Sequence, residues 1–368
     1  MISGSLGELT FFRGRVALYA ILKALEIGVG DEVATQAFTC VAVPEAIMAT
    51  GARPVYVDLE SNGFNMDADD LEGKITSRTR AIVVQHTYGI PADMERIISV
   101  TERADLPLIE DCCHTLASTY KGRTVGSFGV ASFYSFEWGK PIVVGIGGSA
   151  VVNDPKLRDK VRRQYRTYQF PGVLNQSRIQ LQYLAFRLLF KPSLYWRIRG
   201  LFRWLGSIGV AESNYNPIDE DSVAEDFSLR MPKSLQRRLA RKLTILDRQT
   251  AHSRWAANEY WTRIQSEVVA HPVLPDDSST VFARYPLVTQ HKEGLLRKAR
   301  QVNVELADWY NTPIHPLSKE ELPSVRYVIG SCPNAEARCR QAVTLPTHSA
   351  VKKRDIDRAI EFLNEVAL

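Results

Sequence analysis

Two residues in the first half of this 368-residue chain combine a reactive type with unusual surroundings, Asp111 and Lys140. Asp111 ends the apolar run 107–111, where a carboxylate is costly to bury unless it is paired. Lys140 lies between the apolar run 131–136 and the glycine-rich run 145–148, so its amine is partly desolvated and available in the neutral form. Neutral lysines form imines with carbonyl compounds. The pair indicates carbonyl chemistry supported by a buried acid.

Ordinary structural roles are the alternative for both residues. Asp111 could cap the following helix, and Lys140 could be a surface lysine beside a turn, although few charges surround it. Together they match pyridoxal phosphate, which needs a lysine for its aldehyde, a carboxylate for its ring nitrogen and donors for its phosphate. The hydroxyl of Ser135 and the backbone N–H groups of a helix starting near Gly14 could bind that phosphate. We therefore expect pyridoxal phosphate as the cofactor.

The elements that would position these residues alternate along the chain. Short apolar runs rich in β-branched residues are separated by helix-length segments, which favours buried strands of a mainly parallel sheet and an α/β fold. In such sheets, reactive groups gather where strands end. The clearest strands are predicted at 53–58, 80–86, 106–111 and 130–135.

The C-terminal part has a different pattern. A helical segment is predicted over 237–264, followed by a strand-like run at 281–288 and a final amphipathic helix at 354–365. Because the chain is also too long for one simple core, we expect two domains, a large one over 1–245 and a smaller one over 246–368.

Composition excludes several classes of protein. With 45% hydrophobic and 24% charged residues the chain is typical of a folded globular protein, and a net charge of +5 is far below that of a dedicated nucleic-acid binder. The five scattered cysteines favour a reduced, cytoplasmic protein over a disulfide framework, and their spacing does not indicate a metal site. Neither a secretory signal nor a membrane-spanning run is expected.

One stretch of the chain is unusual in charge. No acidic residue lies between Asp159 and Glu212, whereas arginines and aromatic residues are interleaved there. The plain interpretation is a helical insertion that packs its aromatic side chains inward and leaves its arginines solvated. The alternative is a surface for a phosphate-bearing partner, either a nucleotide diphosphate or anionic lipid headgroups, with peripheral membrane contact through 160–205. Nucleic acid is less favoured, because the rest of the chain is nearly neutral.

Several segments, in this order and spacing, resemble one family. Motifs similar to those of the DegT/DnrJ/EryC1/StrS aminotransferases occur at 109–114, 122–126, 132–140 and 145–148. Further matches occur at 30–33, 37–40, 64–66, 86–94, 333–336 and 345–348. The resemblance covers nearly the whole chain outside about 165–225. It implies fold type I of the pyridoxal-phosphate-dependent transferases, with a mainly parallel sheet in the large domain and an α+β small domain.

The resemblance assigns roles to four residues around the cofactor. Lys140 matches the lysine that holds the cofactor as an internal aldimine and later carries the Cα proton as general base and acid. Asp111 matches the partner of the pyridine nitrogen, and His114 lies where the family has Gln or His near the phenolic oxygen. Ser135 matches the phosphate-binding serine. A lysine at position 140 also argues against the family's dehydratase branch, which has histidine there.

Some positions of the cofactor site depart from the family pattern. Gly14-Arg15 stands where the family has Gly-Thr, so one hydroxyl to the phosphate is missing, and Arg15 either replaces it with charge or points away. Cys40 stands where an aromatic ring often stacks on the pyridine, and Ser228 replaces a frequent Asn. Gly14, Arg15 and Cys40 stay candidates for cofactor binding.

Four further residues are candidates for substrate contact. His86 and Tyr88 lie in a middle motif, and a satisfied strand-end histidine is the alternative for His86. Arg230 resembles the arginine of the family's Arg-Met pair, in a segment that reaches toward the neighbouring subunit's site, and His315 lies in a region near the substrate channel. The resemblance thus implies a homodimer with active sites at the subunit interface.

The predicted reaction is a two-stage transamination. The resemblance implies an amino-acid donor, L-glutamate by family analogy, and a nucleotide-linked keto-deoxy sugar as the acceptor. A keto cyclitol, a lipid-linked ketone or another secondary-metabolite ketone is the alternative acceptor. A non-catalytic regulator or scaffold is a second alternative, because of the departures at Arg15, Cys40 and Ser228.

Overall fold

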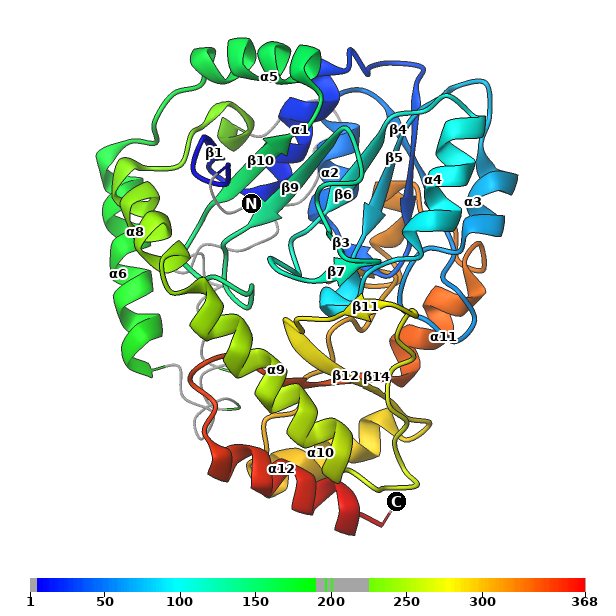
Figure 1. The fold of residues 1–368 in the computed structure, drawn as a ribbon, viewed down its shortest axis with the longest axis vertical. Coiled ribbons are helices and arrows are strands. Elements are labelled where there is room, and N and C mark those ends of the chain that lie inside the picture. Colours follow the sequence, from blue (N-terminus) through cyan, green and yellow to red (C-terminus); the bar gives the residue numbers. More distant parts are fainter. Residues whose placement is uncertain (1–4, 190–195, 197–199, 201–224, 368) are drawn as a thin grey trace.

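The computed structural model describes residues 5–189, 196, 200 and 225–367. Its centre is a seven-stranded sheet built from the N-terminal part of the chain (Figure 1). Only β10 runs opposite to the other six strands, so the sheet is mainly parallel, as predicted. In spatial order the strands are β1 (Leu9–Phe11), β10 (Gly148–Val152), β9 (Ala131–Ser135), β6 (Leu108–Asp111), β5 (Thr79–Gln85), β2 (Glu32–Gln36) and β4 (Arg53–Val57).

Both faces of this sheet are covered, as a parallel sheet requires. Successive residues along a strand alternate between two cores: Val33 and Val83 face one layer of helices, whereas Ala34 and Val84 face the other. This alternation explains why the strands are apolar at nearly every position. The first layer contains α1 (Gly14–Ala24), α2 (Ala42–Met48) and α5 (Pro155–Thr167), and the second contains α3 (Ala68–Lys74) and α4 (Met94–Arg103).

The C-terminal part forms a smaller α+β unit, at the bottom of Figure 1. Its antiparallel sheet and its helices share one apolar core, which also includes Phe38, Tyr56 and Tyr88 of the N-terminal part. The division of the chain at residue 245 stays a prediction. The elements of this unit are α9 (Leu246–Arg263), β12 (Arg284–Val288), α10 (Lys292–Gln301), α11 (Pro333–Gln341), β14 (Ala342–Pro346) and α12 (Lys353–Glu365).

The segment predicted to be helical over 237–264 is helical in the structure, but it is divided into two helices. The first, α8 (Lys233–Leu243), is followed by a turn at Ile245, which is 44% exposed, before α9 begins. The two helices bury their apolar faces in different cores. Leu239 of α8 packs in a core of the N-terminal part, and Tyr260 of α9 packs in the C-terminal core. A turn between them is needed to redirect the chain.

Two small sheets join the C-terminal unit to the N-terminal part. One pairs β3 (Thr39–Cys40) with β13 (Ile314–His315), and the other pairs β7 (Thr119–Tyr120) with β8 (Arg123–Thr124) and β11 (Ser278–Ser279). The remaining elements are α6 (Val173–Leu189) and 3-10 turns at Thr87–Gly89, Glu225–Ser228 and Leu322–Val325. No helix in the part of the chain that the structure describes is both long and apolar enough to cross a membrane.

Candidate active site

Asp111 lies at the end of β6, where it is 4% exposed. Its Oδ1 accepts a hydrogen bond of 2.9 Å from the backbone N–H of Cys113. Burial raises the pKa of Asp111, and the Cys113 N–H and the nearby charge of Lys140 oppose that rise. Within the described residues no lysine, arginine or histidine forms an ion pair with it. A buried carboxylate in this position is stabilised by any cationic group bound beside it.

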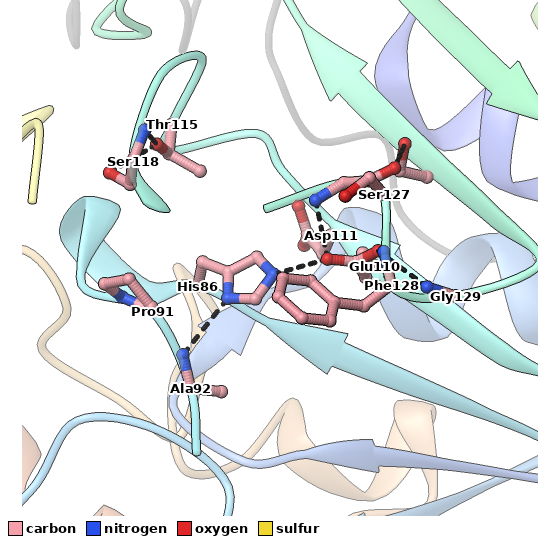
Figure 2. A network of polar contacts seen from close by, with 12 residues as sticks. His86, Pro91, Ala92, Glu110, Asp111, Thr115, Ser118, Ser127, Phe128 and Gly129 are labelled. Carbon is pink, nitrogen blue, oxygen red and sulfur yellow. Dashed lines mark hydrogen bonds and ion pairs between the residues drawn. The ribbon is translucent and has the colours of Figure 1, made fainter. Parts of the chain in front are cut away.

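Glu110, the preceding residue, holds the end of β6 in place through a buried network (Figure 2). Its Oε1 accepts from the backbone N–H groups of Phe128 and Gly129 at 2.7 and 2.8 Å. Its Oε2 accepts from the Gly126 N–H at 2.6 Å and contacts His86 Nε2 at 3.1 Å. The glycine-containing segment that follows β8 therefore positions the carboxylate at the strand end, and with it the neighbouring Asp111.

His86 belongs to this network and has no exposed surface (Figure 2). Its Nδ1 accepts the Ala92 N–H at 3.1 Å, so Nε2 carries the proton and donates it to Glu110. Both ring nitrogens of His86 are hydrogen-bonded, so neither is available to a substrate. The structure therefore favours the alternative in which His86 is a satisfied histidine at a strand end. Donor atoms of His86, Glu110 and Cys112 lie within 4.8 Å of one another, but both Glu110 oxygens are already hydrogen-bonded.

His114 is buried beside Asp111 as a neutral hydrogen-bonding group. Its Nδ1 accepts the Tyr88 N–H at 3.2 Å, which leaves the proton on Nε2, 3.2 Å from the hydroxyl of Tyr310. Burial holds the pKa of His114 well below its usual value, and the charge of Lys140 lowers it further. The imidazole ring centroid lies 4.7 Å from that of Trp309. This side chain therefore adds polarity to the site without adding charge.

Lys140 follows β9 through a short turn that includes Gly139, at φ +79°. Its Nζ lies 5.1 Å from the ring centroid of Trp309. It forms no ion pair and no side-chain hydrogen bond with any described residue. Its charge nevertheless acts on Asp111, His114 and Cys40. Lys140, Asp111 and His114 are called the strand-end cluster below. We call the lysine amine uncommitted because it has no ion pair or hydrogen bond with a described residue.

The start of α1 forms a second part of the site. The helix begins at Gly14, as predicted, without a side-chain cap and without an acidic residue in its first turn, so its first N–H groups remain available. A Cβ on Gly14 would lie 3.1 Å from the Cβ of Ser135, and one on Gly148 would lie 2.3 Å from the Arg13 oxygen. Glycine therefore allows the helix start and the Ser135 side chain to approach each other. N–H groups and a hydroxyl in this arrangement suit a phosphate.

Arg15 points away from this helix start and into a buried group of charges. Its Nη1 lies 2.7 Å from Glu45 and its Nη2 lies 2.7 Å from Asp226. Burial alone would lower the pKa of Arg15, but the two carboxylates outweigh it and raise that pKa. Of the two alternatives for Arg15, the structure shows the one in which its guanidinium does not face the phosphate position.

Arg13 joins the same group, with Nε 3.2 Å from Asp226 and Nη1 3.4 Å from Glu137. The charge cluster, as it is called below, consists of Arg13, Arg15, Glu45, Glu137 and Asp226. It connects the start of α1 to α2, to the turn before Lys140 and to the segment 225–228.

The other predicted site residues lie in three different places. Cys40 is paired in register with His315 through the β3–β13 contact, which brings the C-terminal unit to the site. Tyr88 is fully buried, and its hydroxyl donates to the Trp309 carbonyl and accepts the Tyr310 N–H at 3.1 Å, so it positions those two residues. Its predicted substrate contact does not fit this burial.

Arg230 lies outside the strand-end cluster. Its Nη2 donates to the Arg166 carbonyl at 2.6 Å, and its guanidinium lies 4.5 Å from the ring centroid of Tyr165. Both contacts are with the end of α5.

Sequence reasoning missed several residues of the site. Trp309 and Tyr310 come from the C-terminal unit, and the carboxylates of the charge cluster come from three separate segments. An aromatic pair just before the run Pro313-Ile314-His315 was the one local signal for the first two. The carboxylates had no local signal.

The family of the chain follows from a comparison with family models. Residues 8–189 and 199–364 match the model of the DegT/DnrJ/EryC1/StrS aminotransferase family. The chain belongs to this family. The match omits only 190–198 between its two parts, a shorter gap than the 165–225 expected from the sequence. The predicted family, fold class, aminotransferase activity and pyridoxal phosphate cofactor are thereby confirmed.

The relatives of this DegT-family aminotransferase include a regulatory protein and two enzymes that are named for sugars. It is 29% identical over 357 residues to a pleiotropic regulatory protein of Geobacillus stearothermophilus, covering 96% of this chain and 82% of that protein. It is 28% identical to a dTDP-3-amino-3,6-dideoxy-alpha-D-galactopyranose transaminase of Aneurinibacillus thermoaerophilus, covering 95% and 83%. A match of 44% identity to a GDP-perosamine synthase of Escherichia coli O157:H7 covers only 41% of this chain and 42% of that protein.

Solved structures share the fold of this DegT-family chain. DesV of S. venezuelae superposes with a TM-score of 0.76 at 25% identity, covering 97% of this chain and 84% of that one. The Bacillus subtilis protein ntda, solved with bound PMP, superposes with a TM-score of 0.70 at 22% identity, covering 96% and 72%.

The residues of the site fit pyridoxal phosphate. Lys140 is an amine without a described polar partner, Asp111 is a buried carboxylate without a described ion pair, and α1 starts without a side-chain cap beside Ser135. These three features match the aldehyde, the ring nitrogen and the phosphate of the cofactor, respectively.

Proposed function

We propose that this chain transfers an amino group from an amino acid to the keto group of a nucleotide-linked sugar. The observation that carries the proposal is the uncommitted Nζ of Lys140, close enough to Asp111 and His114 for its charge to act on both. Support for the acceptor class comes from relatives named for GDP-perosamine and for a dTDP-linked amino sugar. We propose L-glutamate as the donor.

Each residue of the strand-end cluster would have a different role in the reaction. When bound, pyridoxal phosphate supplies an aldehyde for amine exchange and a ring that accepts an electron pair. Asp111 would keep a proton on the ring nitrogen, since its buried carboxylate stabilises a cation beside it. Lys140 would take the proton from Cα of the donor and later return one to the carbon of the acceptor. Because His114 is neutral, it adds no second positive charge near the ring nitrogen.

The phosphate would be held by the first N–H groups of α1 and the Ser135 hydroxyl. Arg15 would not bind it directly. Its role is to keep the segment 225–228 against the helix start through Asp226. Arg13 shares that carboxylate and so supports the same contact.

We also propose a homodimer whose two active sites each use both subunits. Arg230 supports this, because the described contacts of its side chain are with Tyr165, Arg166 and Phe170 and not with the strand-end cluster of its own chain. His315, half-buried beside Cys40, is our candidate for substrate contact within the chain. The cytoplasmic location stays a prediction from the sequence.

The test is a labelled transfer with the full chain supplied with pyridoxal phosphate. We expect ¹⁵N from L-glutamate to appear in at least one nucleotide-linked keto sugar of a panel and not in free keto cyclitols. Transfer to a cyclitol or to a lipid-linked ketone would replace the proposed acceptor. If the donor half-reaction also fails with every amino acid tried, the proposed function is wrong.

A further inference from the structure

A stripe of exposed leucines follows one face of α6. Leu174, Leu181, Leu184 and Leu188 are spaced by seven, three and four residues, so they lie along one side of the helix, and they are 88%, 70%, 52% and 64% exposed. The opposite side is the buried one. A single solvent-exposed leucine is ordinary, but four in one helical row need a partner surface.

The opposite face of α6 explains why the helix is held in this orientation. Ile179 is fully buried there, and Tyr183 and Phe186 lie against Trp138, with ring centroids 6.3 and 4.7 Å from its own. The prediction that aromatic side chains of this stretch turn inward holds for these two. Part of the acid-free stretch lies outside the described residues, namely 190–195, 197–199 and 201–211.

A row of cations runs along the neighbouring helix. Lys233, Arg237 and Arg241 of α8 are spaced by four residues and are all exposed. The two helices lie side by side at the left of Figure 1, joined by a hydrogen bond of 2.9 Å between Gln180 and Ser234. The leucine stripe and the cation row together are called the docking surface below.

The two helices that carry the docking surface have basic residues and no acidic ones. The sequences of α6 and α8 contain two and five basic residues, respectively, and no acidic residue. The basic residues are Arg178, Arg187, Lys233, Arg237, Arg238, Arg241 and Lys242. Of these, Arg238 is turned toward α6, with its guanidinium 3.6 Å from the ring centroid of Tyr183.

We propose that the docking surface binds an anionic lipid bilayer at its headgroup region, a property independent of the proposed function. Exposed leucines beside lysines and arginines are the composition of helices that lie in a membrane interface, where the apolar row enters the acyl boundary and the cations meet lipid phosphates. Charge complementarity decides between occupants. In a symmetric pairing of two copies this surface would face itself and oppose like charges.

Vesicle sedimentation tests the proposal with the full chain supplied with pyridoxal phosphate. Large vesicles of phosphatidylcholine with 30% phosphatidylglycerol are compared with vesicles of phosphatidylcholine alone, at 0.15 M salt. We expect the protein to sediment with the anionic vesicles at least tenfold more strongly than with the neutral ones. Raising the salt to 0.5 M should release most of it, since phosphate contacts by cations are screened.

Two paired variants separate the contributions of the two rows. Leu181→Glu with Leu188→Glu should abolish binding, and Arg237→Gln with Arg241→Gln should weaken it on the order of 20- to 30-fold, about fivefold for each cation. The matched controls are Val29→Glu and Arg103→Gln, at an exposed valine and an exposed arginine of other segments. We expect both controls to bind as the unaltered chain does.

Absence of preferential binding to the anionic vesicles overturns the proposal. So does unchanged binding by both paired variants. If the leucine variant instead halves the molar mass in solution by light scattering, a second copy covers this surface and the lipid proposal is wrong. The donor half-reaction of each variant, which does not use these residues, confirms that the chain is folded and keeps the result separate from a failure of the catalytic proposal.

Discussion

The strand-end cluster and the charge cluster border the same site but are built differently. The strand-end cluster has one lysine and one carboxylate that do not pair with each other, and its histidine is neutral. In the charge cluster two arginines and three carboxylates contact one another directly, at distances between 2.7 and 3.4 Å. One set of charges is left open to a ligand, and the other is closed on itself.

This difference indicates that the strand-end cluster serves the reaction and that the charge cluster stabilises the fold. Uncommitted charges in a buried place are costly to the fold, so they persist where a ligand uses them. Charges that satisfy one another bind no ligand but fix the geometry of the segments they join. We therefore expect changes in the strand-end cluster to reduce activity, and changes in the charge cluster to reduce stability.

Arg15→Thr should have the largest effect on stability. It restores the residue type that the family usually has, but it leaves Glu45 buried without its cation and leaves Asp226 with Arg13 alone. Breaking one side of a buried ion pair costs about 3 to 5 kcal/mol, so the free energy of unfolding in urea should fall by that amount. The control, Arg103→Thr, breaks an exposed pair with Glu72 and should cost less than about 1 kcal/mol. Equal losses in the two variants would contradict the role of the charge cluster.

Asp111→Asn should have the largest effect on activity. The amide keeps the hydrogen bond from Cys113 but removes the charge that would hold the ring nitrogen protonated. We expect the donor half-reaction to slow on the order of 10² to 10³-fold, measured by the decay of the visible absorbance of the loaded protein. The unfolding free energy should not fall. Glu102→Gln, an exposed acid on α4, is the control. A slow variant that is also unstable would mean that Asp111 supports the fold instead.

His114→Gln should alter the dependence of stability on pH. The pKa of the folded histidine lies well below 6.5, so between pH 7.5 and 5.5 the unfolded chain takes up a proton that the folded chain does not. Stability is therefore lost as pH falls, by about 1.3 kcal/mol over this interval for this one group. Glutamine can accept from Tyr88 and donate to Tyr310 without titrating. Urea unfolding at both pH values should show a correspondingly smaller loss in the variant, and identical losses would contradict a neutral His114.

Glu137→Gln should have the smallest effect. Its contact with Arg13 is the longest of the charge cluster, at 3.4 Å, and its side chain is 13% exposed. Arg13 keeps its contact with Asp226 when Glu137 is changed, so we expect the unfolding free energy to fall by about 1 kcal/mol or less, as for the loss of a single hydrogen bond. A loss as large as that of Arg15→Thr would mean that the cluster acts as one unit and not as a set of graded pairs.

The part of the molecule that sequence could predict is the part fixed by local pattern. Apolar runs and their spacing predicted the parallel strands, and the ends of neighbouring strands then had to bring Asp111 near Lys140. Contacts between distant segments had no such signal. Tyr310 reaches His114 across 196 positions and Asp226 reaches Arg15 across 211, so neither partner could be named from its surroundings in the chain.

The two substrate-contact predictions that do not fit the structure have a related cause. His86 was placed correctly at the end of a strand, but the side-chain partners of His86 and Tyr88 were not visible in the sequence. A buried histidine satisfied by Glu110 and a ligand-binding histidine have the same local pattern. The break between α8 and α9 was missed because both halves carry helical periodicity, and only the packing into separate cores requires a turn.

Borohydride reduction followed by peptide mapping tests the central claim most directly. Reduction of the chain loaded with pyridoxal phosphate should leave a covalent pyridoxyl group on the side chain of Lys140, and Lys140→Ala should carry none at any position. A pyridoxyl group on a different lysine, or none in the unaltered chain, would contradict the account of the strand-end cluster.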